Sequence, residues 1–175
     1  MLTVGNLLSN IAKGQSSIPV RMIFKGLNAI YDDIKRGIKV PKAEYMNEGV
    51  LIYMVIPSED MKKEYDVCFW FSTKTTVNKN VKFKVYSNSP GFGFTSAYIF
   101  NKKKSLLWPD KYPSIMLRKA PKERNPYGTV GFDKHVYAGL KHIYKDNLYN
   151  YIKASDPDAK VQVMDFEEKL KSLRR

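Results

Sequence analysis

The chain has 175 residues, of which 43% are hydrophobic and 13% aromatic, so it can bury a core and lacks the composition of a disordered protein. Its only cysteine, Cys68, excludes an internal disulfide, and its longest purely apolar run, residues 50–56, is too short to span a bilayer. Thirty basic against 17 acidic side chains give a net charge of +13, which favours an acidic partner over a simply solvated surface.

The first half of the chain predicts an arm and a helix. Residues 1–18 are small and polar with a few leucines, which is typical of an N-terminal arm. A helix is predicted to begin at Ile18-Pro19 and to end at Gly37, after Lys35 and Arg36. Its apolar side chains recur at steps of four, three and four, so they share one face: Ile23, Leu27, Ile30 and Ile34.

Four strands are predicted next, over residues 50–56, 65–71, 81–86 and 92–100. In the third, apolar residues alternate with Lys82 and Lys84, which places both lysines on the outward face. The turn residues between the third and fourth strands predict a hairpin. The sequence therefore predicts an antiparallel sheet.

The second half predicts a long connection and two helices. Prolines throughout residues 101–128 favour an extended segment on the surface. A second main helix is predicted over about 130–153, and a short amphipathic helix near the C-terminus. The predicted fold is α+β: an arm (1–18), one domain with about four antiparallel strands flanked by two main helices (19–155), and a tail helix (156–175).

No residue pattern points to catalysis, a metal or a cofactor. His135 and His142 lie seven residues apart on one predicted helix, about 10 Å along its axis, so one metal ion cannot join them. Cys68 lies among apolar residues, which predicts a buried, unreactive thiol. Phosphate-loop, dinucleotide and hydrolase motifs are not found. We therefore expect a protein that is not an enzyme.

The positive charge is concentrated in one part of the sequence. Between Lys74 and Arg124 there are twelve basic residues and two acidic ones, interleaved with aromatic side chains. Lysine outnumbers arginine 24 to 6, so contacts with DNA would depend on charge and not on reading bases. The expected contacts with nucleic acid or an acidic partner are Lys82, Lys84, Lys102, Lys103, Lys104, Arg118, Lys119 and Arg124.

The stretches KFKVYSNSPGFGFTSAYIFNKKK and KAPKERNPYGTVGFDKHVY resemble small virion structural proteins of tailed bacteriophages of low-GC hosts, over about residues 65–145. The resemblance implies a neck, tail or capsid-associated subunit without an active site. Its expected partners are other virion proteins, copies of itself and double-stranded DNA bound by non-specific charge contacts. The subunit is expected near the head–tail connection of a virion that is assembled in the host cytoplasm. No membrane is expected. The expected assembly contacts are Trp108, Tyr112, Phe166, Leu170 and Leu173.

A second interpretation stays open from the sequence. The same basic and aromatic side chains suit a free, sequence-nonspecific nucleic-acid-binding protein, such as a regulatory one.

Overall fold

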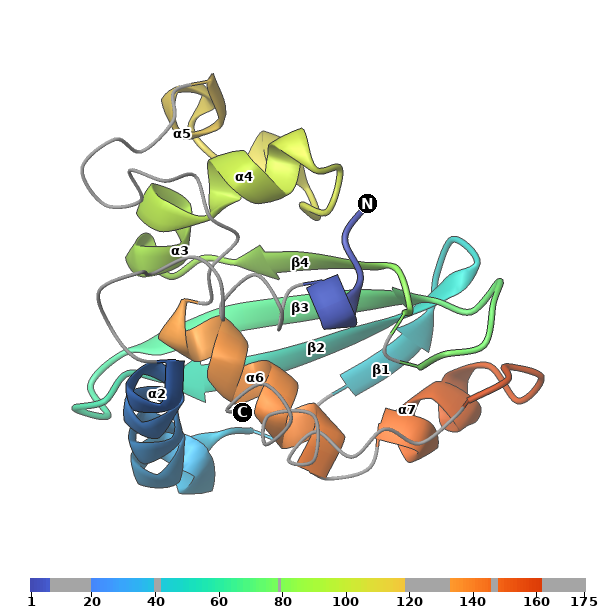
Figure 1. Ribbon diagram of the computed structural model, residues 1–175, viewed down its shortest axis with the longest axis horizontal. Coiled ribbons are helices and arrows are strands. Elements are labelled where there is room, and N and C mark those ends of the chain that lie inside the picture. The colour runs from blue at the N-terminus through green and yellow to red at the C-terminus, as the bar shows by residue number, and fades with distance from the viewer. Residues whose placement is uncertain (7–19, 40–41, 79, 119–132, 146–147, 162–175) are drawn as a thin grey trace.

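The computed structural model in Figure 1 describes residues 1–6, 20–39, 42–78, 80–118, 133–145 and 148–161. One four-stranded antiparallel sheet and several helices make up an α+β fold. The strands are β1 (Lys42–Tyr45), β2 (Gly49–Pro57), β3 (Glu64–Ser72) and β4 (Phe83–Ser87). The helices are α2 (Val20–Ile34), η1 (Lys35–Gly37), α3 (Pro90–Thr95), α4 (Ala97–Lys102), η2 (Pro109–Lys111), α5 (Ser114–Arg118), α6 (Lys134–Lys145) and α7 (Leu148–Ser155).

The sheet has the order β1-β2-β3-β4, so each strand pairs with its neighbour in sequence. The predicted strands 50–56, 65–71 and 81–86 correspond to β2, β3 and β4. Beyond β4, the amide of Val85 donates to the carbonyl of Ser105, and the amide of Leu107 donates to the carbonyl of Val85. Residues 105–107 thus run along the outer edge of β4.

One face of the sheet forms the core. Alternate side chains of β2 and β3, such as Ile52, Met54 and Phe69, are buried on this face, as period-two alternation requires. Helix α6 packs on β2 and β3, α7 packs on β1 and β2, and α2 packs on α6 (Figure 1). The opposite face of the sheet therefore lies away from these three helices.

The prediction of a fourth strand over 92–100 is wrong, because this segment forms α3 and α4. Ser89 is the N-cap of α3: its hydroxyl accepts a hydrogen bond from the amide of Phe92 at 3.2 Å, and Pro90 follows it. Phe92, Ser96 and Phe100 recur every four residues and are buried. The alternating glycines and phenylalanines imitate a strand, but the burial follows a helical period.

The sheet is completed by β1, which the sequence did not predict. Its residues, KAEY, have little preference for strands. A two-residue turn holds β1 against β2: Asn47 and Glu48 have φ of 51° and 59°, and the amide and carbonyl groups of Met46 and Gly49 bond to each other. Glutamate at the second turn position weakens the sequence signal, because glycine is the usual residue there.

The remaining predicted elements are partly matched. The first helix ends with η1 at Gly37, as expected. Within the helix predicted over 130–153, the described residues form α6 and α7, and α7 ends before Asp156-Pro157. The segment after α4 is not simply extended, since it contains η2 and α5. Most of the predicted tail helix lies outside the described residues. No helix in the described ranges is long and apolar enough to cross a membrane.

Candidate functional site

The sheet face opposite α2, α6 and α7 carries two rows of side chains, because residues paired across antiparallel strands lie on the same face. We call this surface the open face. One row crosses all four strands through Lys42, Tyr53, Cys68 and Tyr86. The next row contains Glu44, Leu51, Trp70 and Lys84. These two rows combine aromatic rings, lysines and the carboxylate of Glu44, whereas the core face is apolar. Asp66, which pairs with Val55, lies on the open face beside them.

Two lysines lie over two tryptophan rings on this surface. The Nζ of Lys84 is 5.6 Å from the centroid of the Trp70 ring, and the Nζ of Lys111 is 5.7 Å from that of Trp108. Both distances are within the range of cation–π attraction. Each pair presents a flat aromatic surface together with a positive charge.

Trp70 is fixed by the hairpin between β1 and β2. Its indole N–H donates to the carbonyl of Met46 at 2.8 Å. The ring lies so close to Gly49 that a Cβ there would come within 2.4 Å of it. Only glycine at this position leaves room for the ring.

Trp108 reaches the open face from the segment beside β4. Its φ of 46° lies in the left-handed region, which a bulky residue seldom occupies. The ring packs edge-on against Tyr86, with the centroids 5.3 Å apart, and extends the first row beyond β4. The strained backbone is therefore coupled to the placement of an aromatic side chain on this surface.

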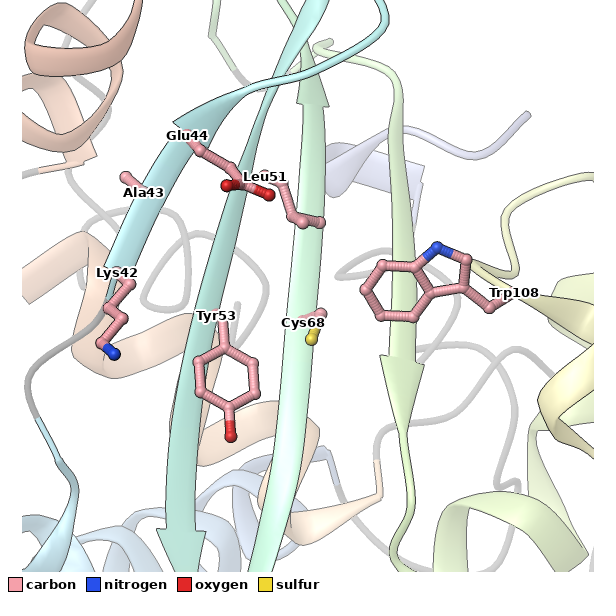
Figure 2. Close-up of a pocket in the computed structure, with 7 residues that line it drawn as sticks. All are labelled: Lys42, Ala43, Glu44, Leu51, Tyr53, Cys68 and Trp108. Atoms are coloured by element: carbon pink, nitrogen blue, oxygen red, sulfur yellow. The ribbon is translucent and has the colours of Figure 1, made fainter.

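A groove of about 330 Å³ lies on the open face (Figure 2). Figure 2 shows the rings of Tyr53 and Trp108 on either side of Cys68, with Leu51 beside it. Lys42, Ala43 and Glu44 of β1 complete the lining. Cys68 is much smaller than Tyr53 and Tyr86, its neighbours in the row, so the surface is hollowed at this point. The volume is at the lower end for small-ligand pockets, which begin near 300 Å³.

The cysteine in the groove is a packed, unreactive side chain. Cys68 is 1% exposed and packs with Leu51 and Leu107. Burial, with a smaller contribution from the charge of Asp66, raises the pKa of the Cys68 thiol to about 12. The predicted burial of Cys68 is confirmed.

Tyr53 is held by a hydrogen bond. Its hydroxyl donates to Oδ1 of Asp66 at 2.6 Å, while Nδ2 of Asn88 donates to the other carboxylate oxygen at 3.1 Å. The bond to Asp66, and then burial, raise the pKa of Tyr53 to about 12. The ring is therefore positioned by a neutral hydroxyl.

The predicted cationic residues that can be placed are solvent-accessible. None of them forms an ion pair within the described ranges, whereas Lys39, Lys74 and Lys134 pair with Glu64, Glu48 and Glu59. The set is Lys82, Lys84, Lys102, Lys103, Lys104 and Arg118. Lys84 is on the open face, and the triple lysine directly precedes the segment that leads to Trp108.

Of the remaining predicted contact residues, one is buried and five lie outside the described residues. Tyr112, expected to contact other subunits, is only 9% exposed; its hydroxyl donates to the carbonyl of Ser87 and accepts from the amide of the same residue. Its side chain is used within the chain. Five other predicted residues lie outside the described residues: Lys119, Arg124, Phe166, Leu170 and Leu173.

A buried Asp133–His135 pair is a helix cap. The Oδ1 of Asp133 accepts from the amide of His135 at 3.0 Å and lies 3.2 Å from its Nδ1, at the start of α6. Both side chains are buried. Among the described residues, no three His, Cys, Asp or Glu side chains form a group that could hold a metal ion.

Sequence reasoning missed Lys42, Glu44 and Tyr53, because no β1 was predicted and residues 50–56 look apolar on both faces.

Comparison with family models, with curated proteins and with solved structures gave no match for this chain.

Proposed function

We propose that the protein is a non-enzymatic binder of single-stranded nucleic acid, and that the open face of its sheet is the binding surface. The observation that carries this proposal is the pairing of both tryptophans with lysines on one face, Lys84 with Trp70 and Lys111 with Trp108. Rings stack on bases and lysines attract phosphates, so the two components of such a surface are present together.

Single strands fit this surface better than duplexes. The bases of a duplex are stacked on each other, so their faces are not available to protein side chains. Exposed aromatic rings on a four-stranded sheet are a known way of holding splayed bases. The partial exposure of Tyr53, Trp70, Tyr86 and Trp108 favours the same use here.

Binding is expected to tolerate most sequences. Stacking accepts every base, and lysine is a point charge that meets phosphate without reading base edges. The net charge of +13 adds long-range attraction, and affinity should fall as salt rises.

The test is the affinity for a fluorescently labelled 12-nucleotide single strand, of DNA and of RNA, and for the matching duplex, measured by anisotropy at 50 mM salt. The variant Lys84→Glu/Lys111→Glu reverses two charges on the open face and should weaken single-strand binding at least tenfold. The matched control, Lys25→Glu/Lys145→Glu, changes the same charge on α2 and α6, where both lysines are exposed. It should weaken binding only about twofold.

Equal losses in both variants would contradict the proposal, since they would show a general effect of net charge. The same conclusion would follow if the unchanged protein had no measurable affinity for any single strand at low salt.

The particle subunit predicted from the sequence is the second candidate. It is supported by α5, which exposes Ile115 (70% exposed) near Arg118, a cation that forms no ion pair with the residues described. A large apolar side chain in water suits a contact with another protein. In that setting the basic side chains would meet DNA or an acidic neighbouring subunit inside a virion near the head–tail connection.

The native mass of the purified chain tests this second candidate. A discrete oligomer that Ile115→Lys dissociates, with nucleic-acid affinity unchanged, would support a subunit that assembles through α5. A monomer at every concentration, for the unchanged chain and for Ile115→Lys alike, would count against self-assembly through this helix.

A further inference from the structure

Glu44 is an anomaly on a surface that attracts phosphates. Its carboxylate lines the groove, and Figure 2 shows it reaching from β1 toward Leu51. No ion pair or hydrogen bond joins its carboxylate to another described side chain, whereas the carboxylate of Asp66 is bound by Tyr53 and Asn88. A carboxylate at this position repels the phosphates of a bound strand. Glu44 can therefore favour binding only through a contact with another part of the nucleotide.

Base edges differ in what they offer a carboxylate. A carboxylate accepts hydrogen bonds at both oxygens. The Watson–Crick edge of guanine presents two adjacent donors, N1–H and the N2 amino group. On cytosine and adenine the amino donor is next to an acceptor nitrogen, and on thymine and uracil the one N–H lies between two carbonyls. Guanine is therefore the base that satisfies a carboxylate with two parallel bonds.

The groove has the shape for such a contact. Tyr53 and Tyr86 lie two strands apart, which is about 10 Å, and Cys68 lies between them. Tyr53 and Trp108 line this space on either side of Cys68, and the carboxylate of Glu44 reaches it from β1 (Figure 2).

We propose that the groove above Cys68 is a base-binding site that selects guanine through Glu44. The proposal rests on the function proposed above, because it needs a single strand on the open face. It adds one selective position to a surface that otherwise tolerates any sequence.

The experiment compares three labelled 12-nucleotide strands. One contains only thymine, and in the other two, three separated thymines are replaced by guanine or by hypoxanthine. Hypoxanthine lacks only the amino group of guanine, so it removes one of the two bonds. The unchanged protein should bind the guanine strand about tenfold more tightly than the thymine strand, with the hypoxanthine strand between them.

Glu44→Gln should remove the preference and leave the affinity for the thymine strand equal or higher, since one negative charge is lost. Glu48→Gln is the matched control: it removes the same charge from the turn beside β1, where Glu48 pairs with Lys74 outside the groove. It should keep the preference.

The outcomes separate the two proposals. Equal affinity of the unchanged protein for all three strands would overturn guanine selection and leave the proposed function standing. A preference that survives Glu44→Gln would place the selection elsewhere and overturn the role of Glu44. If the unchanged protein bound none of the three strands, the proposed function itself would be overturned.

Discussion

At the scale of single residues, Cys68 shows how a buried side chain shapes the site without taking part in chemistry. It is the small member of a row with Tyr53 and Tyr86, so the groove exists because this position is small. Its thiol is also the least accessible group of that row. Size and burial, not reactivity, account for a cysteine at this position.

The first prediction concerns the reactivity of this thiol. Because its pKa is raised from 9.0 to about 12, the neutral thiol is favoured in the folded protein, and this contribution to stability is complete below about pH 9 and lost as the pH rises toward 12. A thiol reagent at pH 8 should label the native protein far more slowly than the protein in urea. Equal labelling rates would show that the thiolate is accessible.

The second prediction is that Cys68→Ser destabilises the protein without changing its affinity for a single strand. The hydroxyl needs a hydrogen-bond partner among apolar neighbours, and a buried group without one costs about 1–3 kcal/mol. Urea unfolding measures the loss. A variant as stable as the unchanged chain would contradict the packing described here.

The third prediction assigns a stacking role to Tyr53. Tyr53→Ala should weaken single-strand binding about tenfold, since one stacked base contributes about 1–3 kcal/mol, whereas Tyr53→Phe keeps the ring and should change affinity little. Tyr45→Ala is the matched control: this exposed tyrosine of β1 pairs with Val50 and so points away from the open face. Equal losses for Tyr53→Ala and Tyr45→Ala would remove Tyr53 from the site.

At the scale of elements, a glycine of α6 determines how closely this helix packs on the sheet. A Cβ at Gly139 of α6 would lie 2.8 Å from the sulfur of Met54, 2.9 Å from Ile56 and 3.1 Å from Phe69. This helix therefore approaches β2 and β3 as closely as it does because position 139 has no side chain.

A fourth prediction follows from two helical glycines. Gly139→Ala should destabilise the protein, because overpacking costs about 1–3 kcal/mol and outweighs the roughly 0.5–1 kcal/mol that alanine gains in a helix. Gly26→Ala in α2 should stabilise it by about 0.5–1 kcal/mol, because nothing lies within 4 Å of the new Cβ and alanine favours helix. Opposite shifts in the urea midpoint are expected, and shifts of the same sign would contradict the helix packing.

The elements also show what sequence patterns could and could not predict. Strands β2, β3 and β4 follow from their apolar runs and from the alternation of Val81, Phe83 and Val85 with the lysines. Strand β1 depends on pairing with β2 through a tight turn, which composition does not reveal. The site was predicted only in part for the same reason: Lys84 and Trp108 belong to the basic and aromatic stretch, but the rows are set by register.

At the scale of the whole molecule, charge and aromatic surface are arranged together. Helices cover one face of the sheet, and the other combines both tryptophans with lysines that have no described acidic partner. The exposed triple lysine Lys102–Lys104 lies at the end of α4, directly before the segment that leads to Trp108.

A fifth prediction concerns the triple lysine. Changing Lys102, Lys103 and Lys104 together to glutamate should weaken binding by a similar factor for every sequence, because these side chains meet phosphates and not bases. The salt dependence of the affinity should become shallower at the same time. A loss confined to one sequence would mean that the triple lysine reads bases.

Tryptophan fluorescence reports directly on whether nucleic acid occupies the open face, because the chain has only two tryptophans and both lie on that face. A base stacked on an indole ring quenches its emission. Titration with a 12-nucleotide single strand at 50 mM salt should quench tryptophan fluorescence to saturation. Trp108→Phe should reduce the amplitude, and 300 mM salt should reverse the quenching. Unchanged tryptophan emission, in a titration where anisotropy shows the strand bound, would place the nucleic acid elsewhere and contradict the claim.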